Sequence, residues 1–435
     1  MLKINKLALV AVTLITFNSF FNLSAQERTY SPFSRFGLGE TQNIGYSGTS
    51  GMANTGIGMR SAYGINNQNV ASLTALDSMS FYFDGGFSYF WQRQEIGELT
   101  LKNSNIVFDY FALAFSVSPK ISSSVGIKPL TSSGYNFVII EDQEDGTESY
   151  SQITGNGNLT AAYLSLAFKA TKNLSLGADI SYAFGNLRNI SKSSFGGSSS
   201  GLNHGILKET RIASVLYNFG AQYTREIGEE KSITFGLTYR PNINLKGDTT
   251  SYIARGSEFG DDNNLFYTPR GVDTLRYDNN KFDNGELQYA SAIGFGVSYE
   301  IKDKLIVGFD YKTELWSDAA HFDESFRYVN SSSYSVGAEY IPDDRSADSY
   351  ISRIRYRGGA YYKTDNINVY GTDYYNYGIT FGVGIPLKRS RSSINLSLEL
   401  GTKEAVYDLN YKQSYGRVTA NFSLHELWFY KRQFD

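Results

Sequence analysis

The residues best suited to acid–base chemistry are three histidines, His204, His321 and His425. A hydrolytic site needs a base within hydrogen-bond reach of its nucleophile and a third group that orients the base. These histidines fall in a Gly/Ser-rich segment, in a polar loop and near the carboxyl end of the chain. No Ser, His and acid set is expected to assemble, and we predict that the protein is not an enzyme.

Acidic residues offer two weak metal sites. The run Asp261-Asp262-Asn263-Asn264 carries oxygen ligands, but it lacks the glycine and the terminal glutamate of a dedicated calcium loop. His321 lies near Asp318 and Asp323, yet one imidazole with scattered acids makes a poor site. The chain has no cysteine to supply a thiolate ligand. We therefore predict no metal site and no cofactor.

Further charged residues alternate with apolar ones, which places them on one face of a strand. In the segment 305–319, Leu305, Val307 and Phe309 would face outward, while Asp310 and Lys312 would face inward. Such charges either pair across a lumen and hold it shut or hydrated, or they recognise a substrate. The expected interior charges are Asp179, Asp310, Lys312, Glu314, Glu399, Arg240, Arg355 and Arg357.

The elements that must position these residues are strands with a strict two-residue period. Such a period, with one apolar and one polar face, requires hydrocarbon on one side and water on the other. No apolar stretch after the amino terminus is long enough for a helical span. The predicted strands are 79–93, 100–118, 123–140, 150–171, 174–195, 207–227, 232–255, 286–302, 305–319, 332–341, 354–365, 372–387, 391–403 and 411–424. We predict an all-β fold, a 14-stranded antiparallel transmembrane β-barrel spanning residues 79–425.

The joints between these strands alternate in length. Short turns at 119–120, 172–173, 228–231 and 303–304 alternate with long loops at 142–149, 196–206, 259–285 and 322–331. Outer-membrane barrels have short periplasmic turns and long extracellular loops. The joint 342–352 is the exception, a longer one on the periplasmic side. An even strand number then places both chain ends in the periplasm.

The amino-terminal residues 1–25 have the features of a secretory signal peptide: two lysines, an apolar run and the sequence Leu23-Ser24-Ala25. Export to the cell outer membrane is therefore expected. Residues 26–78, rich in Gly, Ser and Asn, precede the first strand and are predicted to form a hatch inside the lumen. The formal charge of −3 and the scattered basic residues exclude a nucleic-acid-binding surface.

This amino-terminal region resembles the hatch of the FadL-type transporters of long-chain fatty acids and aromatic hydrocarbons. The likeness rests on the segments 33–39 and 48–53 and on the element Asn69-Val70-Ala71, which lacks the proline of the family's Asn-Pro-Ala element. The family barrel also has fourteen strands, with the first one following the plug. The resemblance implies a hatch or gate role for Phe33, Phe36, Gly37, Gly39, Asn69, Val70 and Ala71.

The third predicted strand provides a second point of likeness. Lys128, Pro129 and Gly134 lie within an otherwise strand-like run, and the family bends this strand to open a gap in the wall. Proline removes a ladder donor and glycine tolerates unusual backbone angles, so pairing with the second strand should be interrupted here. A simple bulge that relieves curvature is the alternative.

The resemblance implies an outer-membrane passive transporter of hydrophobic small molecules, with lateral exit through the wall. Leu265, Phe266 and Tyr267 would capture the solute, although they could equally pack against a neighbouring loop. The acidic character of the loop 259–285 departs from an apolar capture groove and leaves the substrate class open.

The tail 426–435 is aromatic and cationic, and it suggests an alternative function. It is either an assembly signal with Phe434 as its aromatic residue, or a periplasmic docking strip for other outer-membrane or periplasmic proteins, with Trp428 and Phe429 as anchors. In the second case the chain would be a structural or accessory barrel subunit of a larger outer-membrane protein complex. The expected partners are thus a hydrophobic solute, membrane lipid and other membrane proteins.

Overall fold

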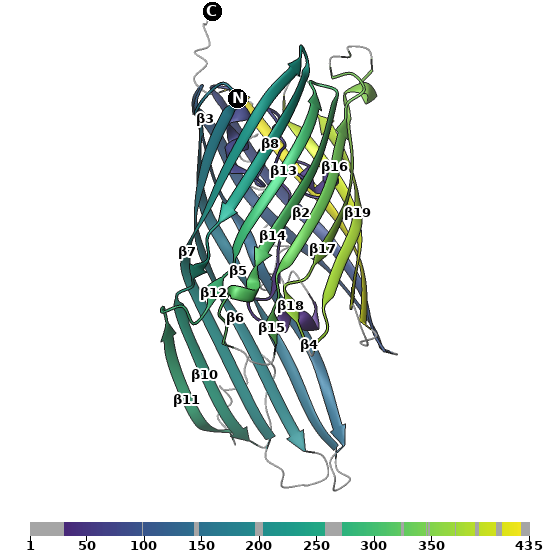
Figure 1. Ribbon diagram of the computed structural model, residues 1–435. Coiled ribbons are helices and arrows are strands. Elements are labelled where there is room, and N and C mark those ends of the chain that lie inside the picture. Colours follow the sequence, from purple (N-terminus) through teal and green to yellow (C-terminus); the bar gives the residue numbers. More distant parts are fainter. Residues whose placement is uncertain are drawn as a thin grey trace, which may run out of the picture.

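A computed structural model describes residues 30–97, 99–142, 148–195, 203–256, 272–322, 326–344, 346, 349–369, 371–387, 391–405 and 411–427 (Figure 1). These residues form a tall barrel of tilted strands, with one group of strands continuing well beyond the others at one end. In the described part of the chain, no helix has the length and apolar character needed to cross a bilayer.

Fourteen strands close the barrel by antiparallel pairing of chain neighbours, and the ring closes where β2 pairs with β21. They are β2 (Ser80–Ile96), β3 (Leu99–Ser118), β4 (Ile121–Asp142), β5 (Glu148–Lys169), β6 (Leu174–Phe195), β7 (Asn203–Gly228), β8 (Lys231–Arg240), β13 (Ser291–Ile301), β14 (Leu305–Leu315), β16 (Ser331–Tyr340), β17 (Arg355–Thr364), β19 (Tyr374–Pro386), β20 (Ser393–Ala405) and β21 (Tyr411–Leu427). The predicted strand number and barrel fold are confirmed.

The other elements are short or lie outside the ring. The remaining strands are β1 (Glu40–Thr41), β9 (Ile243–Asn244), β10 (Gly247–Gly256), β11 (Val272–Phe282), β12 (Gln288–Tyr289), β15 (Arg327–Tyr328) and β18 (Ile367–Asn368). The 3₁₀ helices are η1 (Pro32–Arg35), η2 (Thr49–Met52), η3 (Val70–Ala75), η4 (Trp316–Asp318) and η5 (Ile351–Arg353).

The alternation of side chains matches the prediction from the two-residue period. On β6, Leu176, Ile180 and Tyr182 are exposed on the outer wall, while Asp179 and Ser181 are buried inside. The same rule holds on β8 and β14, so an apolar outer surface surrounds a polar interior. Most short turns lie at one end, which we take as periplasmic, and most long connections lie at the other, extracellular end. The exceptions are the short β2–β3 turn at the extracellular end and the long connection 341–354 at the periplasmic end.

The predicted strand 232–255 is wrong, because the structure divides it. Strand β8 ends at Arg240, immediately before Pro241, which has no N–H to continue a ladder. The chain then returns as β10, which pairs with the extracellular half of β7 and with β11. Strand β11 lies within the segment 259–285 that was predicted as a loop.

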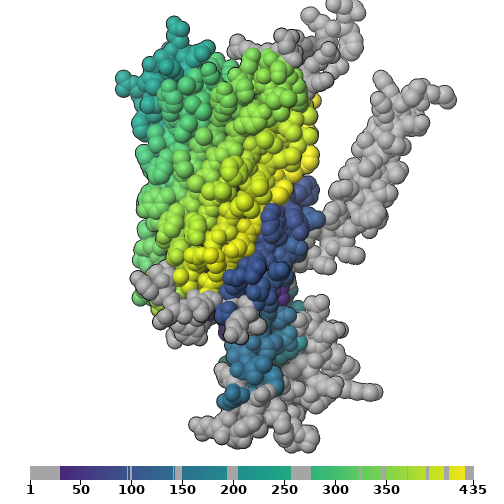
Figure 2. Space-filling view, turned by 90° about the vertical axis from the view of Figure 1, so that its right-hand side faces the viewer, coloured from purple at the N-terminus to yellow at the C-terminus, as the bar shows by residue number. Residues whose placement is uncertain are grey.

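Strands β4 to β7, together with β10 and β11, form a sheet that extends beyond the rest of the barrel, below it in Figure 1. We call this part the projecting sheet. Strand β7 connects it to the wall, since Asn203–Ile212 pair with β10 and Phe219–Gly228 pair with β8. Figure 2 shows the projecting sheet below the wall formed by the carboxyl-terminal strands and the first barrel strands.

The segment Tyr30–Asp77 precedes the wall and contacts its inner face; we call it the hatch. Its first described residue, Tyr30, accepts a hydrogen bond of 2.5 Å from Gln92 and another from Gln94, near the extracellular end of β2. The wall itself begins at Ser80, opposite Leu427, at the periplasmic end. The expectation that both chain ends are periplasmic therefore holds for the barrel strands but not for the start of the described hatch.

Candidate functional site

The lumen is closed at its extracellular mouth by an apolar cluster that we call the lid. It packs loop residues over the first part of the hatch, where Phe33 lies 4.3 Å from Tyr374 and 4.5 Å from Tyr411, measured between ring centroids. The buried core of the lid includes Phe33, Leu38, Leu245, Phe282, Leu287, Trp316, Phe326, Tyr328, Ile367 and Val369. A water-soluble solute would therefore meet a dry barrier at the mouth.

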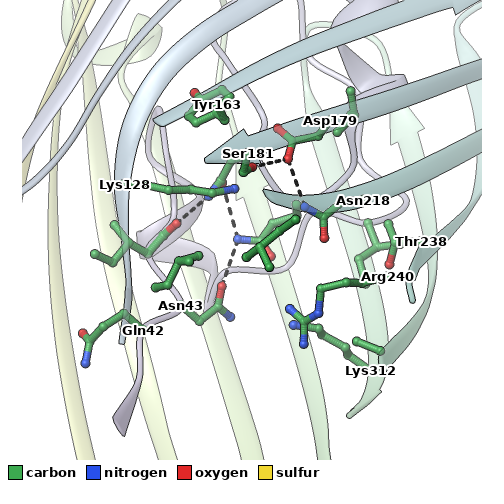
Figure 3. Close-up of a pocket in the computed structure, with 18 of the residues that line it drawn as sticks. Gln42, Asn43, Lys128, Tyr163, Asp179, Ser181, Asn218, Thr238, Arg240 and Lys312 are labelled. Atoms are coloured by element: carbon green, nitrogen blue, oxygen red, sulfur yellow. Dashed lines mark hydrogen bonds between the residues drawn. The ribbon is translucent and has the colours of Figure 1, made fainter. Parts of the chain in front are cut away.

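On the periplasmic side of the lid is a chamber of about 220 Å³ between the hatch and the walls of β4 to β8 and β14 (Figure 3). Its size is below the roughly 300–1,000 Å³ usual for ligand pockets. Lys128 lies at one side and Arg240 and Lys312 at the other, with Asp179 and Asn218 between them. Apolar ligands are usually held by predominantly apolar linings, whereas this chamber has a mixed lining in which charges lie beside apolar residues such as Ile44, Leu73 and Leu216.

Four of the eight predicted interior charges line the chamber and have partners there. Glu314 pairs with Lys312 at 2.7 Å and with Arg240 at 3.6 Å. Asp179 accepts hydrogen bonds from Ser165 at 2.8 Å, from Ser181 at 2.6 Å and from Asn218 at 2.9 Å.

Farther from the chamber, Arg357 pairs with Glu339 at 2.6 Å, and Glu399 accepts a bond of 2.7 Å from Tyr361. The arrangement is the one expected of charges that keep a lumen closed and hydrated.

The hatch rests on a ring of wall glycines that we call the glycine belt. Eight consecutive strands, β6, β7, β8, β13, β14, β16, β17 and β19, each present one inward-facing glycine to the hatch. A Cβ at Gly177 would lie 2.7 Å from the amide nitrogen of Ala71, and one at Gly296 would lie 2.6 Å from that of Gly58. The belt consists of Gly177, Gly220, Gly236, Gly296, Gly308, Gly337, Gly359 and Gly382. At most of these positions hatch backbone therefore lies directly against the wall, while at Gly308 the wall meets the side chains of Met59 and Thr55.

Hydrogen bonds fix the hatch to the same wall. The carboxylate of Asp310 accepts from the backbone amides of Gly56 and Ile57 at 2.6 and 2.9 Å. Gln222 donates to the carbonyl oxygen of Ile57 at 2.9 Å, and Asn69 donates to the same oxygen at 3.0 Å. Buried bonds to a charged group are among the stronger hydrogen bonds in proteins, so this contact is a firm anchor.

The opposite side of the barrel contains a break that we call the seam. Pairing between β3 and β4 ends at Phe111 and Ile127, although both strands continue. Strand β4 carries a bulge between Pro129 and Thr131. Beyond it the hatch takes the place of β3, because Gln42 donates to the carbonyl of Leu130 at 2.8 Å. The expected interruption of pairing is present, and the bulge offered as its alternative accompanies it.

At the periplasmic end the hatch is held by Tyr63. Its hydroxyl donates to Asp303 at 3.0 Å and to Asp344 at 3.3 Å, both in periplasmic turns. The guanidinium of Arg355 lies 3.8 Å from the ring centroid. Burial, together with the nearby carboxylates of Asp344 and Asp303, raises the pKa of Tyr63 well above its usual value. The phenol therefore stays protonated and remains a donor.

The predicted site residues fall into two groups. Phe33, Gly39 and Gly134 meet at the seam, where Ser31 donates to the carbonyl of Gly134 at 2.8 Å and a Cβ at Gly39 would lie 2.6 Å from the carbonyl oxygen of Ser132. Lys128 lies beside them in the chamber, with its ammonium 5.0 Å from the ring centroid of Tyr163.

Two more predicted residues belong to the lid side of the hatch. Phe36 packs 5.4 Å from Phe326, and Gly37, with a φ of +61°, packs against Tyr328. Asn69, Val70 and Ala71 lie elsewhere, on the belt glycines of β6 and β7. Leu265, Phe266, Tyr267, Trp428 and Phe429 lie outside the described residues.

The three histidines lie apart in the described structure. His204 lies in the projecting sheet, and His321 stacks 4.4 Å from Phe326 in the lid. His425 is 3.0 Å from Ser80 near the periplasmic end. No catalytic set forms from them in the part of the chain that the structure describes.

Sequence reasoning missed the glycine belt and the lid. Belt glycines have no shared spacing along the chain, because the distance between them depends on loop length and strand register. Their signal was an inward-facing glycine in the middle of almost every strand, which only correct strand facing and register would have revealed. The lid had a signal too, in the aromatic residues Trp316, Phe326 and Tyr328 of otherwise polar loops.

Comparison with known proteins identifies the fold from solved structures and the family from a sequence model. The solved structure of the CymD monoaromatic hydrocarbon channel aligns with a TM-score of 0.58 at 15% identity, covering 89% of this chain and 98% of that one. The Pseudomonas putida toluene transporter TodX aligns with a TM-score of 0.58 at 14% sequence identity, covering 90% of this chain and 100% of that one. A Pseudomonas aeruginosa FadL homologue aligns with a TM-score of 0.55 at 12% sequence identity, covering 89% of this chain and 99% of that one.

These values establish a shared fold with the FadL-type barrels, as the sequence resemblance implied. No curated protein matches the chain. The sequence model of the BamG family, in contrast, matches residues 3–435, almost the whole chain. The chain therefore belongs to the BamG family.

Proposed function

We propose that this barrel is a structural subunit of a larger outer-membrane protein assembly rather than an open conduit. The observation that carries the proposal is the glycine belt, where hatch backbone lies against seven of the fourteen wall strands and hatch side chains lie against an eighth, β14. Moving the hatch would separate all of these contacts together with the bonds to Asp310. A lumen closed in this way suits a barrel whose working surface is its exterior.

Two further features support this function. The chamber is small and charged, so it offers a hydrophobic solute little favourable surface. The projecting sheet extends beyond the wall at the extracellular end; residues at its base, such as Phe282, join the lid, and its outermost described strand, β11, faces the surroundings. Exposed sheet edges are common sites of protein association.

The test is purification of a tagged chain from its own bacterium in mild detergent. A structural subunit is expected to elute together with other outer-membrane proteins in a fixed ratio. A matched variant removes the β10–β11 hairpin by replacing residues 248–281 with a short turn, since Gly247 and Phe282 are directly opposed. This variant should fold as a barrel and lose its partners. A wild-type barrel that elutes alone would overturn the proposal.

A second candidate function, favoured by the seam, is passive transport of small hydrophobic molecules with lateral exit through the wall. It draws on the fold shared with the monoaromatic hydrocarbon channel and the toluene transporter. Its test is uptake of radiolabelled toluene by cells that depend on this barrel.

A disulfide can close the seam for this test, because Thr41 and Thr131 are opposed across the β1–β4 pair and an opposed antiparallel pair suits disulfide geometry. The chain has no cysteine of its own to interfere. If the seam carries solute, the T41C/T131C variant should take up toluene only after reduction. Equal uptake in both redox states, or uptake no greater than in cells without the barrel, would remove this candidate.

A further inference from the structure

The outer wall carries a groove of about 1100 Å³ where β19, β20 and β21 meet β2 and β3. Figure 2 looks onto this face, where the yellow carboxyl-terminal strands meet the dark blue first strands. Most side chains that line the groove point outward, away from the lumen, by the strand alternation described above. The groove is therefore separate from the chamber and the seam.

The groove lies where a belt of aromatic side chains is interrupted. One row of directly opposed outward residues crosses neighbouring strands as Phe295, Tyr311, Tyr334, Tyr362 and Tyr377. Aromatic side chains favour the membrane interface, but the tilt of the strands makes a row of opposed residues climb around the wall, so its members do not share one level in the membrane. The same row then continues as Thr402, Ser414, Arg93 and Lys102. Hydroxyls and cations thus replace aromatic rings on β20, β21, β2 and β3.

The next row toward the periplasm forms the apolar part of the groove. Its directly opposed residues are Ala360, Ile379, Leu400, Gly416, Trp91 and Ser104. The indole of Trp91 fills the outward position at Gly416. The apolar trough is therefore lined by the large groups of Ile379, Leu400 and Trp91, with the small side chains of Ala360 and Ser104 at the two ends of the row.

The charges of the groove lie at its extracellular end. Arg93 and Lys102 are opposed across the β2–β3 hairpin, three residues from the strand ends Ile96 and Leu99. Arg93 pairs with Glu95 at 2.8 Å, in a pair that is about half exposed. Within the described residues no carboxylate pairs with Lys102. In that part of the chain Lys102 is a cation without a carboxylate partner, and Arg93 separates it from the hydroxyl of Ser414 in the row.

We propose that this groove binds a phosphate-bearing acyl lipid of the outer leaflet. The phosphate contacts Lys102 and Arg93 and accepts a hydrogen bond from Ser414, because cations and hydroxyls suit phosphate oxygens. One acyl chain lies along Ile379, Leu400 and Trp91. Polar groups near the extracellular strand ends, next to an apolar trough, match the division of such a lipid into headgroup and chain.

The experiment is native mass spectrometry of the full barrel in phosphatidylcholine nanodiscs that contain either bisphosphorylated or dephosphorylated lipid A. The wild type should retain the phosphorylated lipid and release the dephosphorylated one. Lys102→Gln should weaken retention about fivefold, the effect expected for one exposed ionic contact. Lys120→Gln, in a periplasmic turn, is the matched charge control and should retain lipid as the wild type does.

Filling the trough tests the acyl-chain contact. Ser414→Phe should abolish retention, while Val418→Phe, on the same face of β21 but outside the groove, should not. Ala360→Val provides a milder second filling variant, and heat-dependent migration on gels verifies that each variant is folded. Equal retention of both lipids, or unchanged retention in folded Ser414→Phe and Ala360→Val variants, would overturn the proposal.

Discussion

The glycine belt and the seam hold the same hatch in two different ways. At the belt, the hatch backbone lies against wall backbone, and Asp310 ties the amides of Gly56 and Ile57 to the wall. At the seam, the hatch takes the place of a missing neighbour strand through a few hydrogen bonds beside Pro129 and Gly134. At the belt, rotating a side chain cannot release the hatch, because the contact is made by backbone atoms. At the seam, the few hydrogen bonds of the β1–β4 pair can break one after another. Any opening of this barrel should therefore begin at the seam.

The strongest way to break this comparison is to place a side chain in the belt. The carbonyl oxygen of Ile57 occupies the position that a Cβ at Gly236 would need. Gly236→Val should cost about 3 kcal/mol, at the upper end of overpacking effects. Urea unfolding in detergent would measure the loss. Gly228→Val is the control, since a Cβ there would meet only the Lys231 side chain at 3.8 Å. Equal stability of the two variants would mean that the belt does not bear the hatch.

Removing the charge that anchors the hatch should have the next largest effect. Asp310→Asn keeps the size of the side chain but weakens two charge-assisted bonds, at a cost of about 2 kcal/mol. Hydrogen exchange of the Gly56 and Ile57 amides should accelerate. Asp318→Asn, whose side chain accepts a bond from Ser317 on the exposed helix η4, should leave this exchange unchanged. Slow exchange in Asp310→Asn would assign the protection to packing alone.

On the seam side, loss of one hydroxyl should have a smaller and local effect. Ser34 donates to the carbonyl of Gly134 at 3.0 Å and accepts from its amide at 3.0 Å. Ser34→Ala should cost about 1 kcal/mol and speed hydrogen exchange of Ser31 and Gln42. The Ile57 amide should be unaffected. If Ile57 also exchanges faster, belt and seam open as one unit and the comparison fails.

The smallest effect is expected at the proline itself. Pro129→Ala restores an N–H, but the bulge and the hatch strand still hold β4 away from β3. We expect a change in stability below about 0.5 kcal/mol and no new protection of the amides in the extracellular half of β3. New protection there would show that Pro129 alone keeps the seam apart.

The wall was predictable from the sequence because period-two alternation survives in every strand that separates lipid from a polar lumen. The predicted strand 174–195 coincides with β6. Prediction failed at 232–255, where apolar residues continue past Pro241 although the chain leaves the wall. Strand β11 was missed because its sequence is polar, as suits an edge strand outside the membrane.

The candidate site was less predictable than the wall. The seam could be foreseen from Pro129 and Gly134, since both residues act on their own strand. The belt, the lid and the groove could not, because each depends on which residues of distant strands become neighbours. The glycine belt and the charges of the chamber are the reasons why we propose a structural role ahead of transport.

Strand β7 has a mechanical consequence for the whole molecule. Its 26 residues run without interruption from the projecting sheet into the wall, paired first with β10 and then with β8. The extracellular part is thus a rigid lever rather than a hinged flap, since no loop separates it from the barrel. A force applied to the outer end of the projecting sheet would be transmitted along β7 to its hydrogen bonds with β8 in the wall. A protein that grips the sheet would thereby fix the tilt of the entire cylinder in the bilayer.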